Sequence, residues 1–190
     1  MDAVFTLPYP EYIVAETLAK LLPKREGFSV NIPLSRQQKG MDLLVYHRAT
    51  GKAAAIQVKS SRPYRGAPPK RKNTPKRFNY YLWFKRFEYQ KEAADFYIIF
   101  GLYPEANIIE GGLNRARVPQ NWWKHKILLL TDTEMENLLK GIRSQNDSFF
   151  AFGFDTYTDE IFLTRGVEIP QLYSDFLIER KVKVLREFLV

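Results

Sequence analysis

Residues 53–61, AAAIQVKSS, read as a short apolar strand that contains two polar side chains. Side chains alternate between the two faces of a strand, so Gln57 and Lys59 share one face while Ile56 and Val58 share the other. The run of alanines and the pair Ile56 and Val58 indicate that this strand is packed within a sheet. We therefore expect the sheet to present an amide and an ammonium group side by side on one of its faces.

The segments before this strand predict a helix followed by an antiparallel meander. Apolar residues recur at helical spacing in PEYIVAETLAKLL, residues 10–22, and a proline follows this segment. Alternating apolar residues predict strands at FSVNIPL, residues 28–34, and at MDLLVYH, residues 41–47. The short connection RATG would join the second of these strands to KAAAIQVKS, residues 52–60, as a hairpin.

Most of the positive charge falls in one segment, residues 62–91. This segment contains ten Lys or Arg residues and one Glu, a net charge of +9 in a chain whose total is +8. A localised basic segment is typical of proteins that bind polyanions, so DNA is the expected partner and RNA is also compatible. The alternative is a solvated loop whose charges serve only solubility. Prolines in the first half predict a loop, while the aromatic second half is ambiguous between strand and helix.

The composition predicts a single globular domain over residues 1–190. The length and the 45% apolar content suit one domain with a substantial core. The absence of cysteine excludes disulfides and cysteine-ligated zinc. No apolar run approaches the ~20 residues of a membrane span, and no signal-peptide pattern opens the chain, so we expect a cytoplasmic protein without a membrane partner. Further expected elements are strands at 94–103 and 125–131, a capped helix after residue 131, a hairpin within 148–166 and a helix over 170–189.

Three polar residues could combine into a site for phosphate chemistry. Asp42 opens the second predicted strand, and a hairpin would place it beside Gln57 and Lys59. A carboxylate and nearby oxygens suit Mg²⁺ or Mn²⁺, which lower the pKa of bound water and screen charge on a phosphate. A lysine near the phosphorus can stabilise the transition state. Each residue also has a structural alternative: a turn aspartate, an amide satisfied within the sheet, and a lysine that extends to water.

The pattern GMDLLV followed by AAIQVKSS, behind a helix that carries a glutamate, resembles the PD-(D/E)XK nuclease superfamily. In that family an Asp precedes a Glu or Asp, one further residue and a Lys. Gln57 replaces the acid, a Q-x-K variant similar to that of a group I intron-encoded homing endonuclease. The resemblance covers about residues 9–103. It implies an α/β fold with a restriction-endonuclease-like αβββαβ core, in which helices flank a mixed central sheet, and a C-terminal extension over about residues 104–190.

The resemblance also implies a metal-dependent DNA endonuclease. Asp42, the main-chain carbonyl of Val58 and Glu11 would bind Mg²⁺ or Mn²⁺. Gln57 would orient the metal-bound water or supply a neutral oxygen ligand, and Lys59 would assist the attack. Because an amide at position 57 removes one negative charge, we expect the site to hold its metal more weakly than a site with a second acid.

Two glutamates on the first predicted helix are candidates for the family's helix glutamate. Glu11 precedes Val14, Ala15 and Leu18 as in the E-x-x-V-A-x-x-L pattern of these nucleases. On a helical wheel it falls within about 20° of Leu18, on the face expected to pack against the sheet. Glu16 falls about 160° away. It remains the alternative, because extra residues separate the matched pattern from the next strand.

The basic segment supplies the candidate DNA contacts. Phosphate contacts fix register without reading bases, and the first candidates for them are Lys70, Arg71, Lys72, Lys76 and Arg77. The neighbouring aromatic residues either stack on unpaired bases or pack in the core, and they are Tyr80, Tyr81, Trp83 and Phe84.

Two rival functions and one assembly state follow from the same residues. Gln57 is also compatible with a non-catalytic nucleic-acid-binding protein on a nuclease fold. The charge alone is compatible with a basic protein that binds an acidic protein surface. Double-strand cutting with one site per chain usually needs two chains, so a homodimer or higher homo-oligomer is a further hypothesis.

Overall fold

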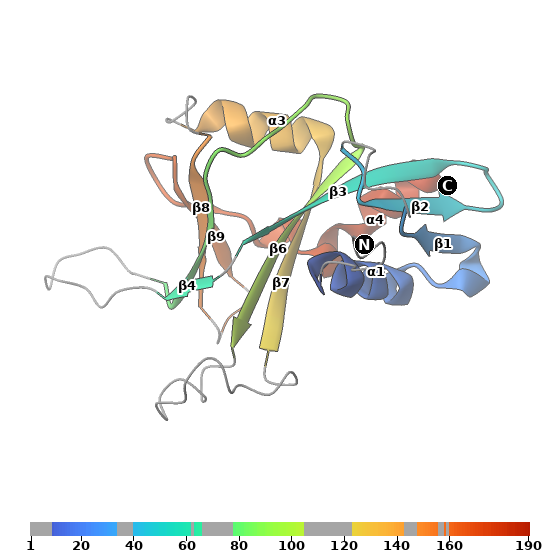
Figure 1. Ribbon diagram of the computed structural model, residues 1–190, viewed down its shortest axis with the longest axis horizontal. Coiled ribbons are helices and arrows are strands. Elements are labelled where there is room, and N and C mark those ends of the chain that lie inside the picture. The colour runs from blue at the N-terminus through green and yellow to red at the C-terminus, as the bar shows by residue number, and fades with distance from the viewer. Residues whose placement is uncertain are drawn as a thin grey trace, which may run out of the picture.

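The computed structural model describes residues 9–33, 40–61, 63–65, 78–104, 123–142, 148–155, 158 and 160–190. This part of the chain forms a mixed α/β structure with two five-stranded sheets and three α-helices. Figure 1 shows the helices α1 and α4 beside one end of the first sheet, and the second sheet with α3 towards the other end. None of the described helices is long and apolar enough to span a membrane.

The first sheet, sheet A, has the strand order β1-β2-β3-β6-β7 and contains both parallel and antiparallel pairs. The predicted meander is confirmed, because β1 pairs antiparallel with β2 and β2 pairs antiparallel with β3. β6 runs parallel to β3, and β7 runs antiparallel to β6. The strands are β1 (Phe28–Asn31), β2 (Leu43–His47), β3 (Ala53–Ser61), β6 (Phe96–Pro104) and β7 (Trp123–Thr131).

Helices α1 (Tyr9–Leu21) and α4 (Ile178–Leu189) cover one face of sheet A. The helical spacing of apolar residues in α1 places Val14 and Leu18 fully inside this layer, against strand residues such as Ile56. The predicted start of the C-terminal helix at residue 170 is wrong. Residues there form the short strand β10 (Gln171–Leu172) and the 3₁₀ turn η5 (Ser174–Phe176), and α4 begins after them. A second 3₁₀ turn, η1 (Lys24–Glu26), links α1 to β1.

The second sheet, sheet B, packs with helix α3 (Asp132–Gly141) against the other face of sheet A. Its strand order is β10-β9-β8-β5-β4. The hairpin predicted within residues 148–166 is confirmed by the antiparallel pairing of β8 with β9. The remaining strands of this sheet are β4 (Pro63–Arg65), β5 (Tyr80–Phe84), β8 (Phe150–Phe154) and β9 (Ile161–Arg165).

Aromatic side chains fill the space between the two sheets. Tyr80 and Phe84 of β5, Phe152 of β8 and Tyr97 of β6 are all buried in this layer. Gly101 of β6 allows the sheets to approach closely, since a Cβ at this position would lie 2.3 Å from Leu82 Cδ2. The high aromatic content of the chain therefore has a structural use in this core.

The predicted αβββαβ core is realised only in part. Helix α1, the meander and a strand parallel to β3 are present in the predicted order. Among the described residues of the connection from β3 to β6 there is no helix, and the chain instead enters sheet B as β4 and β5. The period-two pattern of YYLWF explains this outcome, because Tyr80, Leu82 and Phe84 point inward and suit a strand.

We predict that Gly101→Ala lowers the free energy of unfolding by about 1–3 kcal/mol, because the new methyl group must displace a fully buried Leu82. Urea unfolding followed by circular dichroism measures this change. Gly141→Ala is the matched control, since a Cβ at Gly141 meets no atom within 4 Å. It should leave stability unchanged or slightly raised. Equal stability of the two variants would contradict the close approach of the sheets.

Candidate functional site

The pairing of β2 with β3 places Asp42 beside β3, directly before the first paired residue of β2. Leu43 pairs with Ile56, and the Asp42 N–H also donates to the Ile56 carbonyl at 2.9 Å. Gln57 and Lys59 alternate with Ile56 and Val58 and therefore share one face of β3. The structure thus places Gln57 and Lys59 on one face of sheet A and Asp42 where the neighbouring strand begins, and all three are half-buried.

The Asp42 carboxylate is held against the backbone of β3. Its Oδ2 atom accepts a hydrogen bond from the Val58 N–H at 2.7 Å. In a strand, the N–H and the C=O of one residue point to the same side, so the Val58 carbonyl also points towards the side on which Asp42 lies. The structure thus directs a carboxylate and a main-chain carbonyl to the same side of β3, at the point where β2 begins.

Close packing fixes the surroundings of Asp42 and Lys59. The Lys59 Nζ lies 5.8 Å from the ring centroid of Phe87, close enough for a cation–π contact. Two residues before Asp42, Gly40 has a φ of +92°, and a Cβ there would lie 2.9 Å from atoms of Ala93. Only glycine fits this position without strain. The segment between β5 and β6 therefore packs against both the approach to Asp42 and the lysine side chain.

Helix α1 lies on the other face of sheet A, the face to which Val58 points. Glu11 therefore does not share the face of Gln57 and Lys59, although it is half-buried. Glu16 lies on the solvent side of the helix, where its side chain is 46% exposed and pairs with Lys20 at 2.6 Å.

Contacts of Arg186 tie the end of α1 to the region where β1 begins. At the end of α1, the Leu21 carbonyl accepts a hydrogen bond from Arg186 Nη2 at 3.2 Å, and Arg186 also pairs with Glu26. Glu26 lies two residues before β1, whose first residue pairs with the last residue of β2. The last turn of the helix is thus near the end of β2.

The donor set fits a hard divalent cation. The two donors that the structure directs to the same side of β3 are the Asp42 carboxylate and the Val58 carbonyl, and both are oxygen donors of the kind that Mg²⁺ and Mn²⁺ accept. Among the described residues, no group of three or more His, Cys, Asp or Glu side chains is placed to hold a metal. With two carboxylates at most, neutral oxygens and water would complete the coordination.

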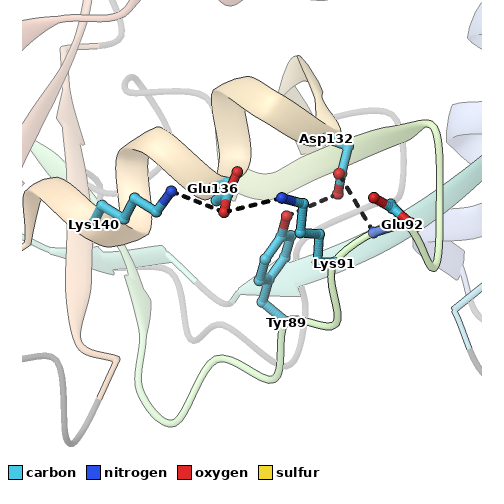
Figure 2. A network of polar contacts seen from close by, with 6 residues as sticks. All are labelled: Tyr89, Lys91, Glu92, Asp132, Glu136 and Lys140. Atoms are coloured by element: carbon cyan, nitrogen blue, oxygen red, sulfur yellow. Dashed lines mark hydrogen bonds and ion pairs between the residues drawn. The ribbon is translucent and has the colours of Figure 1, made fainter.

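A polar network positions the segment that packs on Lys59. Figure 2 shows its members, which are Tyr89, Lys91, Glu92, Asp132, Glu136 and Lys140. The Tyr89 hydroxyl donates to Asp132 Oδ1 at 2.9 Å, and the Glu92 N–H donates to Asp132 Oδ2 at 3.4 Å. Asp132 is the first residue of α3, so the network ties this segment to the helix. The capped start of α3 was predicted, but no signal in the sequence indicated this long-range pairing.

Other predicted contact residues fall into three groups. Lys70, Arg71, Lys72, Lys76 and Arg77 lie outside the described residues. Tyr80 and Phe84 pack in the core between the sheets, which settles their role as structural. Tyr81 and Trp83 alternate with them and lie half-buried on the outer face of sheet B.

Comparison with known proteins adds no relative, since the chain matches no family model, no curated protein and no solved structure. The resemblance to PD-(D/E)XK nucleases thus rests on the motif residues and their placement.

We predict that the protein loses stability as the pH rises from about 10 to about 12. Burial, followed by the charge of Asp132, raises the pKa of Tyr97 to about 12. Unfolded tyrosine titrates near 10, so above that pH the unfolded chain releases a proton that the folded chain retains, and unfolding becomes more favourable. Burial and the Asp132 hydrogen bond also raise the pKa of Tyr89.

Urea unfolding at about pH 9 and about pH 11 measures this loss, which is on the order of 1 kcal/mol per pH unit for each group. Tyr97→Phe removes the hydrogen bond to the Gln90 carbonyl at both pH values but removes only one titrating group. The variant should therefore show a smaller drop between the two pH values. An equal drop in the variant and the wild type would contradict the assignment to Tyr97.

Proposed function

We propose that this protein is a metal-dependent endonuclease that hydrolyses phosphodiester bonds in DNA. The observation that supports this proposal is that the Asp42 carboxylate is held against β3, the strand that carries Gln57 and Lys59 on one face. The Asp42 carboxylate is oriented by the 2.7 Å hydrogen bond from Val58 N–H. A fixed carboxylate, an amide and a lysine beside one another supply the charges and hydrogen bonds that phosphate hydrolysis needs.

In this proposal Asp42 and the Val58 carbonyl hold Mg²⁺ or Mn²⁺. The metal would supply positive charge for the phosphate and a water of lowered pKa. Gln57 can accept a hydrogen bond from the attacking water through its amide oxygen and so orient it. An amide carries no negative charge, so the affinity for the cation is lower than with glutamate at this position.

Lys59 acts on the phosphate rather than on the metal. Its ammonium group stabilises the negative charge that grows on the phosphate oxygens in the transition state. The contact with the Phe87 ring holds the side chain over the face that also carries Gln57. A positioned ammonium group loses less entropy on meeting the phosphate than a free one.

The basic segment 62–91 supplies affinity for the DNA backbone. It begins three residues after Lys59, so chain connectivity keeps its charge close to the site. Candidate phosphate contacts are Lys70, Arg71, Lys72, Lys76 and Arg77, and RNA would make the same contacts.

We predict that purified protein nicks supercoiled or branched DNA with Mg²⁺ or Mn²⁺ and does not do so with EDTA. Asp42→Asn should reduce cleavage about a hundredfold or more, because it removes the charge that holds the metal. Lys59→Met should reduce it to a similar extent. Agarose gels of time courses measure the rates.

The matched control is Asp95→Asn. Asp95 Oδ2 accepts a hydrogen bond from the Ala55 N–H at 2.7 Å, which repeats the contact between Asp42 and Val58 on the other side of β3. The same loss of charge at this structural carboxylate should leave cleavage near the wild-type rate. Equal rates for wild type and Asp42→Asn, or cleavage that persists in EDTA, would contradict the proposal.

The second candidate is a non-catalytic nucleic-acid-binding protein, which Gln57 favours because it replaces an acid. Gln57→Glu distinguishes the two. The added charge should tighten Mg²⁺ binding, measured by calorimetry, about tenfold on an order-of-magnitude scale. A working nuclease cleaves with either residue at position 57. Cleavage by Gln57→Glu alone, with binding but no cleavage by the wild type, would show that the second candidate is right.

A further inference from the structure

The outer face of sheet B carries side chains that belong to neither core. Tyr81 and Trp83 alternate along β5 with core residues and therefore point away from sheet A. Around them lies a group of rings and one cation, which we call the outer aromatic surface, composed of Tyr64, Phe78, Tyr81, Trp83, Phe149, Phe162 and Arg165. The apolar faces of the three helices pack in the two core clusters, which include none of these residues.

Trp83 and Arg165 meet across a small residue. Trp83 pairs with Ala151 of β8, and Ala151 pairs with Arg165 of β9. The alanine leaves room above it, and the Arg165 guanidinium lies 4.7 Å from the Trp83 ring centroid. The Tyr64 ring lies on the other neighbouring strand, 5.7 Å from the Trp83 ring. Two rings and a guanidinium plane thus lie side by side on one sheet face.

Glycine extends the same arrangement along β8. A Cβ at Gly153 would lie 2.4 Å from the Phe78 ring, so only glycine lets this ring rest against the strand. Phe78 in turn contacts Phe162 at 5.2 Å and Tyr81 at 6.1 Å between ring centroids. The small residues of β8 on this face therefore support a continuous group of rings.

Exposure and charge indicate what this surface would bind. Tyr64 is 52% exposed, Trp83 and Tyr81 are half-buried, and Arg165 is exposed. Strands β4 and β5 belong to the segment 62–91, with its ten basic residues against one acid, so the partner is an anion. An anion that also offers flat rings to aromatic side chains is an unpaired nucleic-acid strand, since duplex bases are already stacked on one another.

The surface is joined directly to the proposed catalytic strand. Two residues after Lys59, the Ser61 hydroxyl donates to the Trp83 carbonyl at 2.9 Å and accepts from the Trp83 N–H at 3.0 Å. β3 then leads into β4, which carries Tyr64 (Figure 1). A strand bound at the aromatic surface would therefore be held by the same segment that carries the lysine.

We infer that the outer aromatic surface binds unpaired nucleotides. The exposed Tyr64 ring stacks with a base, and the Arg165 N–H groups bind a phosphate while the guanidinium plane stays on the Trp83 indole. This inference deepens the proposed function and rests on it for the identity of the substrate: the nuclease would act on DNA that contains an unpaired stretch.

Fluorescence anisotropy with a labelled oligothymidylate and with a matched duplex tests this inference. Tyr64→Ala should weaken binding of the oligothymidylate about fivefold or more, while Tyr64→Phe should retain it, because stacking needs only the ring. Tyr12→Ala is the matched control, since Tyr12 is 54% exposed on α1, which covers the face of sheet A opposite sheet B. Arg165→Gln should reduce the slope of log Kd against log salt by about 0.7.

A second readout reports on Trp83 itself. The chain has three tryptophans, so Trp122→Phe with Trp123→Phe leaves Trp83 as the only indole. Its fluorescence should be quenched by the oligothymidylate with the Kd found by anisotropy. Binding that is unaffected by Tyr64→Ala and causes no quenching would overturn the inference. Polyglutamate that competes as well as the oligothymidylate would also overturn it, since it would show that only charge is recognised.

The cleavage assay separates this inference from the proposed function. Strand binding that depends on Tyr64, in a protein that cleaves no DNA with any metal, would support the surface and refute the nuclease. If the protein cleaves DNA with metal but binds the oligothymidylate equally well after Tyr64→Ala, the binding role of the outer aromatic surface is refuted and the proposed nuclease function is supported.

Discussion

The register between β2 and β3 is the constraint on which the rest of the structure depends. A slip of one residue would exchange the two faces of β3, placing Gln57 and Lys59 under α1 and Ile56 in the polar site. Two independent contacts oppose such a slip. Ile56 is fully buried against α1, and the Asp42 carboxylate is bonded to the Val58 N–H. The interaction that orients the proposed metal ligand is thus one of those that fix the fold.

β3 also connects the two halves of the molecule. It lies between β2 and β6 in sheet A, and its last residue, Ser61, bonds to the backbone of Trp83 in sheet B. One strand therefore carries the core residue Ile56, the polar pair Gln57 and Lys59, and the link to the outer aromatic surface. This arrangement gives a physical reason for a strand in which apolar and polar residues are mixed.

The sequence was sufficient for features that depend on local pattern. Helix α1, the meander, the β8–β9 hairpin and the capped start of α3 all follow from period and turn residues, and the placement of Asp42 beside β3 follows from the hairpin. Long-range features were missed. Pairing of β5 with β8 joins residues about seventy positions apart, and Tyr89 meets Asp132 across forty-three. No local preference encodes such partners, so the sequence left YYLWF ambiguous, and among the described residues between β3 and β6 the structure has strands and no helix.

The alternation of side chains along β5 is enough to separate its core aromatic residues from those on the outer face of sheet B. Tyr80 and Phe84 share a face with Leu82, the most apolar residue of the strand, whereas Tyr81 and Trp83 share the other. Local pattern does not predict residues 170–177 correctly. Their spacing of apolar residues suggests a helix, but in the structure the chain first pairs with β9 as β10 and only then begins α4. There, pairing of Leu172 with Phe162 outweighs local helix preference.

The most direct test of the central claim is to locate a bound metal. Anomalous diffraction from crystals of the protein grown with Mn²⁺ and DNA would show the ion's position. The account predicts a peak about 2.1 Å from both an Asp42 carboxylate oxygen and the Val58 carbonyl oxygen, with Lys59 facing the scissile phosphate. A DNA complex with Mn²⁺ bound elsewhere and none beside Asp42 would contradict it.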